Sequence, residues 1–248
     1  ENGNKEMEKT YKDGRLDGKH ILYYNHPYYK SGKKWREQTY KDGELDGLHT
    51  EWYENGEKKE EGTYKNGIKD GLWKYWCDKI NIYWKKWEKT YKDGELDGLH
   101  TEWYDNREKK EEGTYKDGEL DGLVTYWYEN GNKEMEKTYK DGRLDGKHIL
   151  YYNQGTKDGI LYGEYHPYYK SGKKWREDTY KDGELDGLST CWWSTGWKKW
   201  EGNYKNEKQD GLWTGWYKYG RKYSERLWKD GKVVNVIGLW NEDGSVRE

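Results

Sequence analysis

The chain has 248 residues, with 46 basic and 48 acidic side chains and a formal net charge of −2. It contains 17 Trp, 27 Tyr and no Phe, so indole and phenol rings must supply most of any core. Abundant aromatics and nearly balanced charge argue against a disordered chain, and no run of roughly 18 apolar residues offers a membrane-spanning helix.

The first feature along the chain is a repeat, which begins within a copy at Glu1. A fixed period of this size indicates that each repeat is one supersecondary element that must stack on its neighbours to bury an apolar surface. Most intervals between copies are 24 residues. The marker of each copy is Tyr-Lys-Asp-Gly or a close variant, at Tyr40, Tyr64, Tyr91, Tyr115, Tyr139, Tyr180 and Tyr204.

One complete copy runs from Thr39 to Gly62 and predicts β-strands. Leu48, Thr50 and Trp52 alternate with polar residues, which is the period of two that is typical of a strand. No segment shows sustained helical spacing of apolar residues, and glycines interrupt the chain about every dozen residues. We expect the marker Tyr, two Leu and one Trp of each repeat to form its apolar stripe, with Gly62 covered by a neighbouring ring.

Two glycine-containing connections separate the predicted strands. Asn55-Gly56 lies between two alternating runs and predicts a two-residue type I′ hairpin turn, because both residues accept a positive φ. The other connection, residues 65–71, predicts a longer loop with a glycine near each end. Each repeat is therefore expected to be one antiparallel hairpin.

Later copies vary in length and sequence. Residues 1–25 recur without change at 129–153, and a shortened repeat follows, with Thr156 in the marker position and Tyr168 in the aromatic position. The final stretch, residues 228–248, departs from the pattern and ends in polar residues, so it is interpreted as a cap. The start at Glu1 suggests a fragment, a processed product or an open edge that docks onto another molecule.

These observations predict an all-β fold, an elongated single-layer antiparallel β-hairpin repeat solenoid of about ten repeats. With strands about 4.8 Å apart, each repeat advances the sheet by about 10 Å, and the whole body is expected to be about 95 Å long. The predicted domains are the repeat array over residues 1–227 and the capping repeat over residues 228–248.

The segment DGELDGLHTEWYENGEKKEEGTYK, residues 42–65, resembles the bacterial variant of the MORN repeat found in YwqK-like antitoxin-family proteins. The resemblance covers nearly the whole chain. It implies a β-hairpin sheet and a role in protein interaction, because related arrays serve as scaffolds, as partners of secreted toxins or at membranes. The missing Phe and the variable repeat lengths depart from the family pattern. Choline-binding modules are a looser resemblance, and their Gly-Trp spacing is absent.

The sequence offers no catalytic or cofactor site. Cys77 and Cys191 lie 114 residues apart and form neither a disulfide framework nor a zinc pattern. His49 and His100 occupy equivalent places two repeats apart, about 20 Å from each other by the strand spacing, so they cannot share an ion. The Asp residues stand beside turn glycines, where local backbone hydrogen bonding explains them. We therefore predict a protein that is not an enzyme and needs no cofactor or metal.

Tryptophans outside the repeat pattern are the candidate binding surface. Adjacent residues such as Trp192 and Trp193 point to opposite faces of a strand, so some rings must lie outside the apolar stripe. One interpretation is bulk for both faces of a single-layer sheet, and the other is an exposed strip for a protein chain, sugar rings or a quaternary ammonium group. The candidate residues are Trp73, Trp84, Trp87, Trp193, Trp197, Trp200 and Trp213.

The sequence favours a protein-interaction scaffold or structural module, and the resemblance gives an antitoxin or immunity-like protein as its specific form. The alternatives are a cell-envelope carbohydrate-binding module and a self-assembling fibre subunit. Nucleic acid is a poor partner, because basic and acidic residues are finely interleaved and leave no patch of one sign. The sequence is compatible with the bacterial cytoplasm and with the cell envelope or exterior.

Overall fold

The computed structural model describes residues 5–24, 32–79, 82–153 and 172–247. These residues form strands and turns, and none of them belongs to a helix long and apolar enough to cross a bilayer. The chain divides into two compact units, Glu1–Glu119 and Leu120–Glu248, called unit 1 and unit 2 below. The shortened repeat predicted around Thr156 and Tyr168 lies outside the described residues.

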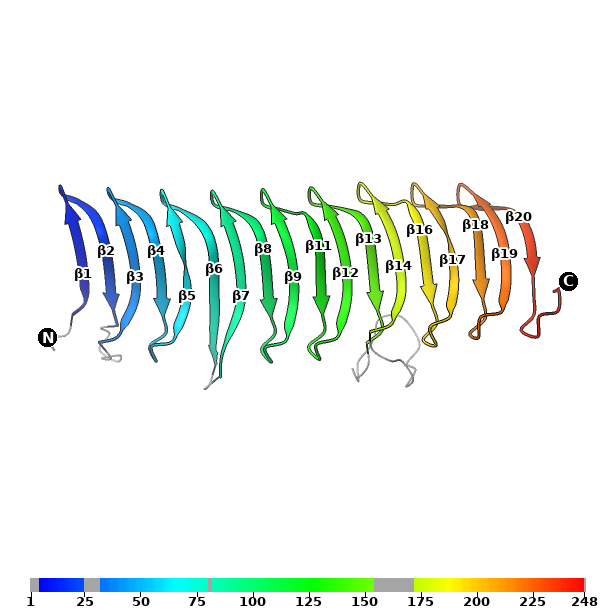
Figure 1. Ribbon diagram of the computed structural model, residues 1–248, viewed down its shortest axis with the longest axis horizontal. Helices are drawn as coiled ribbons and strands as arrows, with labels where there is room; N and C mark the ends of the chain where they lie inside the picture. The colour runs from blue at the N-terminus through cyan, green and yellow to red at the C-terminus, as the bar shows by residue number, and fades with distance from the viewer. Residues whose placement is uncertain (1–4, 25–31, 80–81, 154–171, 248) are drawn as a thin grey trace. The chain divides into compact units, whose positions relative to one another are not determined.

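Unit 1 is an antiparallel sheet in which each strand pairs with the next one along the chain (Figure 1). Every described strand is therefore one arm of a hairpin, as the period predicts. The strands are β1 (Met7–Lys12), β2 (Arg15–Tyr23), β3 (Lys34–Lys41), β4 (Glu44–Trp52), β5 (Lys58–Lys65), β6 (Ile68–Lys79), β7 (Ile82–Lys92), β8 (Glu95–Trp103) and β9 (Lys109–Lys116).

Unit 2 repeats this arrangement, and in it β14 pairs with two short segments, β15 and β16. The predicted fold class, a single-layer antiparallel array of β-hairpin repeats, is thus confirmed in each unit. After β10 (Glu119–Leu120), the strands are β11 (Gly122–Trp127), β12 (Lys133–Lys140), β13 (Arg143–Tyr151), β14 (Lys174–Lys181), β15 (Glu184–Leu185), β16 (Gly187–Trp192), β17 (Lys198–Lys205), β18 (Lys208–Trp216), β19 (Lys222–Lys229) and β20 (Lys232–Leu239).

The two connections of the repeat have the opposite geometry to the one predicted. Asn66 and Gly67 have φ values of 48° and 78°, and the flanking Lys65 and Ile68 pair directly, so the marker sequence makes the two-residue turn. The connection at Asn55-Gly56 is longer. Tyr53 N–H donates to Glu57 O at 2.8 Å, and only Gly56 of the two has a positive φ, of 93°. Asn-Gly here belongs to a three-residue loop followed by a bulge. The bulge is seen in the strand pairing, where Trp52 pairs with Lys58 but Glu51 pairs with Glu60.

Each tight turn is hydrogen-bonded to the repeat before it. Gly67 N–H donates to Leu45 O at 2.7 Å, and Asn66 N–H donates to Asp46 Oδ2 at 3.4 Å. The same pair of contacts joins Gly43 and Asp42 to the preceding repeat. The Leu-Asp-Gly sequence that follows each marker therefore supplies acceptors for N–H groups that a two-residue turn leaves unpaired. These aspartates are structural.

The sheet has two chemically different faces, and their assignment corrects one prediction. Gly47 pairs with Tyr64 while Leu48 pairs with Thr63, so the marker tyrosines and the second Leu of each repeat lie on opposite sides. We call these sides the tyrosine face and the leucine face. The expected single stripe of Tyr, Leu and Trp is wrong, because Leu48 shares the leucine face with Trp52 and is 66% exposed.

Candidate functional site

Among the described residues, the largest fully buried side chains are Trp73, Val124 and Ser189, which lie on the tyrosine face nine residues after their markers. In seven repeats, the residue at this position faces the residue two before the marker across its hairpin, and we call these two residues a core pair. The two members are chemically matched, glycine with Trp and a polar residue with His or Ser. The core pairs are Lys9–His20, Gln38–His49, Gly62–Trp73, Lys89–His100, Lys137–His148, Asp178–Ser189 and Gly202–Trp213.

Gly62 and Trp73 form the most tightly packed core pair. Trp73 is fully buried, and a Cβ on Gly62 would lie 2.2 Å from its Cδ2, so only glycine leaves room for the ring. The indole N–H donates to Thr63 O at 3.0 Å, which satisfies the polar atom. Lys69 Nζ lies 3.7 Å from the ring centroid, in a cation–π contact. The predicted covering of Gly62 by a neighbouring ring is confirmed.

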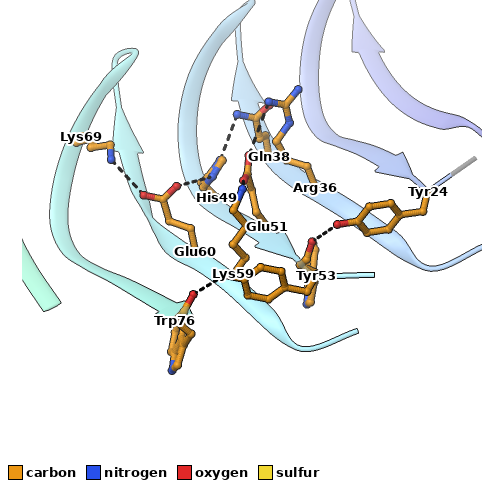
Figure 2. A network of polar contacts seen from close by, with 11 residues as sticks. Tyr24, Arg36, Gln38, His49, Glu51, Tyr53, Lys59, Glu60, Lys69 and Trp76 are labelled. Carbon is orange, nitrogen blue, oxygen red and sulfur yellow. Dashed lines mark hydrogen bonds and ion pairs between the residues drawn. The ribbon is translucent and has the colours of Figure 1, made fainter. Parts of the chain in front are cut away.

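A polar network borders Trp73 on the tyrosine face, and His49 lies at its centre (Figure 2). The His49 ring stacks on Trp73 at a centroid distance of 5.3 Å, and Gln38 Nε2 lies 3.2 Å from its Nδ1. Its Nε2 lies 4.0 Å from Glu60 Oε2, and Lys69 Nζ donates to Glu60 Oε1 at 3.4 Å. Burial lowers the pKa of His49, although the carboxylates of Glu51 and Glu60 act in the opposite direction.

The same network holds two carboxylates side by side. Glu51 and Glu60 are paired in register across β4 and β5, where like charges repel. Lys59 Nζ lies 3.3 Å from Glu51 Oε2, and an Arg36 guanidinium nitrogen lies 4.0 Å from Glu51 Oε1 (Figure 2). With Lys69 on Glu60, each carboxylate has a cation. Both carboxylates are thus ion-paired within the network, which favours a stabilising role over a reactive one.

A related carboxylate site lies over β8 and β9. His100 Nε2 lies 3.4 Å from Glu102 Oε1, and Lys110 Nζ lies 3.5 Å from Glu102 Oε2. These partners, the His100 contact first, lower the pKa of Glu102 to about 2. Within the described ranges, no group of three or more His, Cys, Asp or Glu side chains is arranged to hold a metal ion. The two carboxylate sites are therefore ion-paired parts of the sheet.

In several repeats an aromatic residue follows the Trp and links that repeat to the next. Tyr53 Oη donates to Trp76 O at 2.7 Å, and burial raises the pKa of this phenol. Trp193 occupies the same place in its repeat, and its Nε1 donates to Trp216 O at 2.9 Å. The predicted role of Trp193 as a ligand surface thus competes with a structural role that a Tyr performs elsewhere.

The structure separates the seven candidate tryptophans. Trp73 and Trp84 have exposures of 0% and 4% and lie in the interior of the tyrosine face, away from any exposed strip, whereas Trp213, at 9%, borders the hollow described below. Trp87 stacks on Tyr75 at 5.5 Å with an interplanar angle of 14°. The remaining candidates are Trp193, described above, Trp200, described below, and Trp197, which is 56% exposed and lies against Gly220.

A hollow opens on the tyrosine face of unit 2, over β17, β18 and β19. Its volume is about 260 Å³. Five aromatic residues are among the ten that line it, and Arg226 supplies a positive charge. The lining residues are Trp200, Tyr204, Gln209, Trp213, Thr214, Gly215, Tyr223, Ser224, Arg226 and Trp228.

The leucine face carries a row of exposed leucines, at the position eight residues after each marker. Each leucine is paired with a residue of the neighbouring strand, most often Thr. Lys19 and Lys147 occupy the same position in the duplicated repeats and pair with Glu37 and Glu177. The leucines are Leu48 (66% exposed), Leu72 (47%) and Leu99 (49%) in unit 1, and Leu123 (54%), Leu188 (41%) and Leu212 (46%) in unit 2.

Ion pairs form a second row on the leucine face. Each joins a Lys to the Glu three residues later on the same strand, because the bulge between them brings both onto one face. The lysines are 35–49% exposed and the glutamates 13–34%, so water still screens the pairs and each adds little to stability. The pairs are Lys34–Glu37, Lys58–Glu61, Lys85–Glu88, Lys109–Glu112, Lys133–Glu136, Lys174–Glu177, Lys198–Glu201 and Lys222–Glu225.

The fold and its two faces define a β-hairpin repeat protein. Equivalent side chains recur on the same face in successive repeats. The family model described as MORN repeat variant matches residues 45–66 and 120–141, so the chain carries repeats of this kind at these two places. No curated protein matches the chain. Repeats of this kind indicate binding or scaffolding, and an all-β repeat fold favours a non-enzymatic role.

Sequence reasoning missed both the leucine row and Arg226. The leucines were assigned to the core because they alternate with polar residues, and alternation alone does not say which face is buried. Arg226 stands where other repeats carry a lysine, two residues before the marker, as at Lys89 and Lys137. A basic residue at this position therefore does not stand out in the sequence. The signal that could have found it is the nearby loss of bulk, at Gly215 and Ser224.

Proposed function

We propose that this chain is a non-enzymatic scaffold that binds a protein partner through its leucine row. The observation that supports the proposal is the row itself, since each leucine is 41–66% exposed in a sheet that contains few aliphatic residues. Apolar side chains that gather on one surface of a folded protein mark interaction sites. The neighbouring lysines and glutamates neutralise each other, so the row presents apolar surface with little net charge.

The spacing of the row suits a helical partner. Leucines of consecutive 24-residue repeats, such as Leu48 and Leu72, are two strands apart, about 10 Å by the usual strand separation. One heptad of an α-helix rises about 10.5 Å. A helix with an apolar residue in each heptad, laid across the strands of one unit, would therefore meet one leucine per heptad. An antitoxin-like scaffold is the specific form of this proposal, supported by the resemblance of the repeats.

The test uses lysine at positions where the chain itself already carries lysine. A Leu48→Lys, Leu72→Lys, Leu99→Lys variant copies Lys19 and Lys147, so its fold should be retained. We expect the wild-type chain to co-elute with a partner at fixed stoichiometry, and the variant to bind that partner at least about tenfold more weakly. Val234→Lys, which changes an equally exposed apolar residue outside the row, is the control. Unchanged binding by the triple variant would refute the proposal.

Self-association is a second candidate, favoured by β20. Among the described strands β20 pairs only with β19, and Arg247 N–H donates to Leu239 O at its end; the strand exposes Val234 at 57%, Val236 at 50% and Ile237 at 55%. An apolar strand with a free side is a template for pairing with another chain. Light scattering over a hundredfold range of concentration distinguishes the candidates. A constant mass of 30.1 kDa removes self-association, and a mass that rises with concentration supports it.

A further inference from the structure

We propose that the hollow over β17, β18 and β19 binds an acidic sugar, a pyranose ring that bears a carboxylate, with Arg226 as the ligand of the carboxylate. The hollow lies on the tyrosine face, opposite the leucine row, so this inference does not depend on the proposed protein partner. It rests on three observations. Small residues leave the space open, the Arg226 guanidinium has no carboxylate partner, and aromatic rings line the space.

The space exists because two positions of the repeat have lost their bulk. In unit 1, Tyr75 and Trp87 are paired in register and stacked, and they fill this part of the tyrosine face. Beside Trp213 in unit 2, the equivalent pair is Gly215 and Ser224. Tyr223 partly occupies the space beside Gly215, where an added Cβ would lie 2.4 Å from the Tyr223 ring. The rest stays open as the hollow.

Arg226 brings a positive charge to the hollow without a carboxylate partner. Its counterpart in unit 1, Lys89, lies close enough to Glu102 to lower the pKa of that carboxyl. The strand on the corresponding side of Arg226 carries Leu239 in the place of Glu102. Among the described residues no ion pair involves Arg226, and its side chain is half-buried. A partly desolvated guanidinium gains most from a planar anion that accepts two hydrogen bonds.

The remaining walls suit the body of a sugar. Trp200 and Trp213 lie 5.3 Å apart between ring centroids, and Tyr204 and Trp228 complete an aromatic lining. Such rings offer flat apolar surface to the C–H face of a pyranose. Gln209 and Ser224 add an amide and a hydroxyl for sugar hydroxyls. A few polar groups set in aromatic walls are typical of a small-ligand site.

The choice of a sugar acid over a simple anion follows from the charge of the lining. Arg226 is the one cationic side chain among the lining residues. A single guanidinium matches a monovalent carboxylate better than a phosphate dianion. An acidic peptide side chain could meet Arg226 but would leave the aromatic walls uncovered.

The experiment measures binding of trigalacturonate to the full chain by titration calorimetry, beside a neutral glucose trimer, acetate and inorganic phosphate. Arg226→Gln removes the charge, and Ser224→Trp fills the hollow with the residue that unit 1 carries as Trp87. Lys89→Gln is the matched control, because it removes the equivalent charge where Tyr75 and Trp87 stack in the place of Gly215 and Ser224. Circular dichroism confirms that each variant keeps the strand content of the wild type.

We expect trigalacturonate to bind the wild-type chain and the Lys89→Gln variant equally, and both unit 2 variants at least about tenfold more weakly. Four results would overturn the inference. They are absence of trigalacturonate binding, equal binding of the neutral trimer, competition by acetate or phosphate at the same concentration as trigalacturonate, and an equal loss in Lys89→Gln. The third result would reduce the site to an anion site.

Discussion

The hairpins around Trp73 in unit 1 and Trp213 in unit 2 have the same backbone plan. In both, a glycine lies beneath the ring, and a Cβ on Gly62 or Gly202 would lie 2.2 Å from it. In both, the indole N–H donates to a carbonyl one residue beyond that glycine, at 3.0 Å and 3.1 Å. The repeat thus fixes how a tryptophan is seated.

The surroundings of the two rings differ. His49 and Lys69 contact the ring in unit 1 and extend into ion pairs, whereas Ser189 and Gln209 occupy these positions in unit 2. The first ring is fully buried beside a closed polar network, and the second borders an open hollow. One repeat backbone therefore supports either a closed surface or a cavity, and the choice depends on the side chains of neighbouring strands.

The largest effect on stability is expected when the rings are removed. Trp73→Ala should destabilise the protein by about 4 kcal/mol and Trp213→Ala by about 3 kcal/mol, because the second ring loses fewer contacts. Denaturant unfolding monitored by circular dichroism measures both losses. Hydrogen exchange at β5–β6 and at β17–β18 shows whether each loss is local, as expected in a repeat array. A larger loss for Trp213→Ala would contradict the comparison.

Adding one methyl group under each ring sharpens the comparison. Gly62→Ala should destabilise by about 2 kcal/mol because the Trp73 ring cannot move, and Gly202→Ala by about 1 kcal/mol because Trp213 can shift toward the hollow. The same unfolding experiment measures both. In the double variant Gly62→Ala, Trp73→Ala, the cost of the methyl group should disappear. Additive losses there would show that the ring is not what excludes the methyl group.

The turns that precede the two tryptophans differ at one residue. Gly67 has φ of 78° in unit 1, and Glu207 has φ of 61° in unit 2, a region that costs a residue with a Cβ about 1 kcal/mol. Glu207→Gly should therefore stabilise by up to about 1 kcal/mol, less the added entropy of the unfolded chain. Gly67→Glu should destabilise by a similar amount, since no atom lies within 4 Å of its added Cβ. Melting temperatures that move in the opposite directions would contradict this.

The smallest effect is a pH dependence confined to the hairpin with a histidine. Burial lowers the folded-state pKa of His49 below its unfolded value, so the unfolded chain binds more protons as the solution is acidified. Stability around Trp73 should be complete above about pH 6.5 and decline below it. Hydrogen exchange at β5–β6 between pH 7 and pH 5 measures the decline, which His49→Gln should reduce. Ser189 takes this position beside Trp213, so an equal response at β17–β18 would refute the assignment.

Much of the fold could be predicted from the sequence because its determinants are local. The 24-residue period and the alternation around Leu48 and Trp52 predicted strands, hairpins and repeats correctly. The turn types were exchanged, because Asn-Gly fits both a two-residue turn and the end of a three-residue loop. The difference at Asn55-Gly56 depends on a bulge in the partner strand, which the local sequence does not specify.

The candidate site was less predictable. The seven tryptophans were chosen because they depart from the repeat, and three of them are buried. Burial of Trp73 requires that the glycine opposite it come from the neighbouring strand, in the correct register. The hollow beside Trp213 likewise depends on Gly215 and Ser224, which lie on different strands.

The sequence by itself determined the repeat, its strands and the places where the chain turns, because these depend on residues within one hairpin, but it did not determine which of the two turns is the shorter. The tertiary structure alone decided which face is buried, which rings are covered and where Arg226 is left without a carboxylate. These properties depend on the register between strands, and a shift of one residue would move every side chain to the other face. The spacing of residues along one strand says little about the register between strands. That register is fixed only when the strands pack side by side in the sheet.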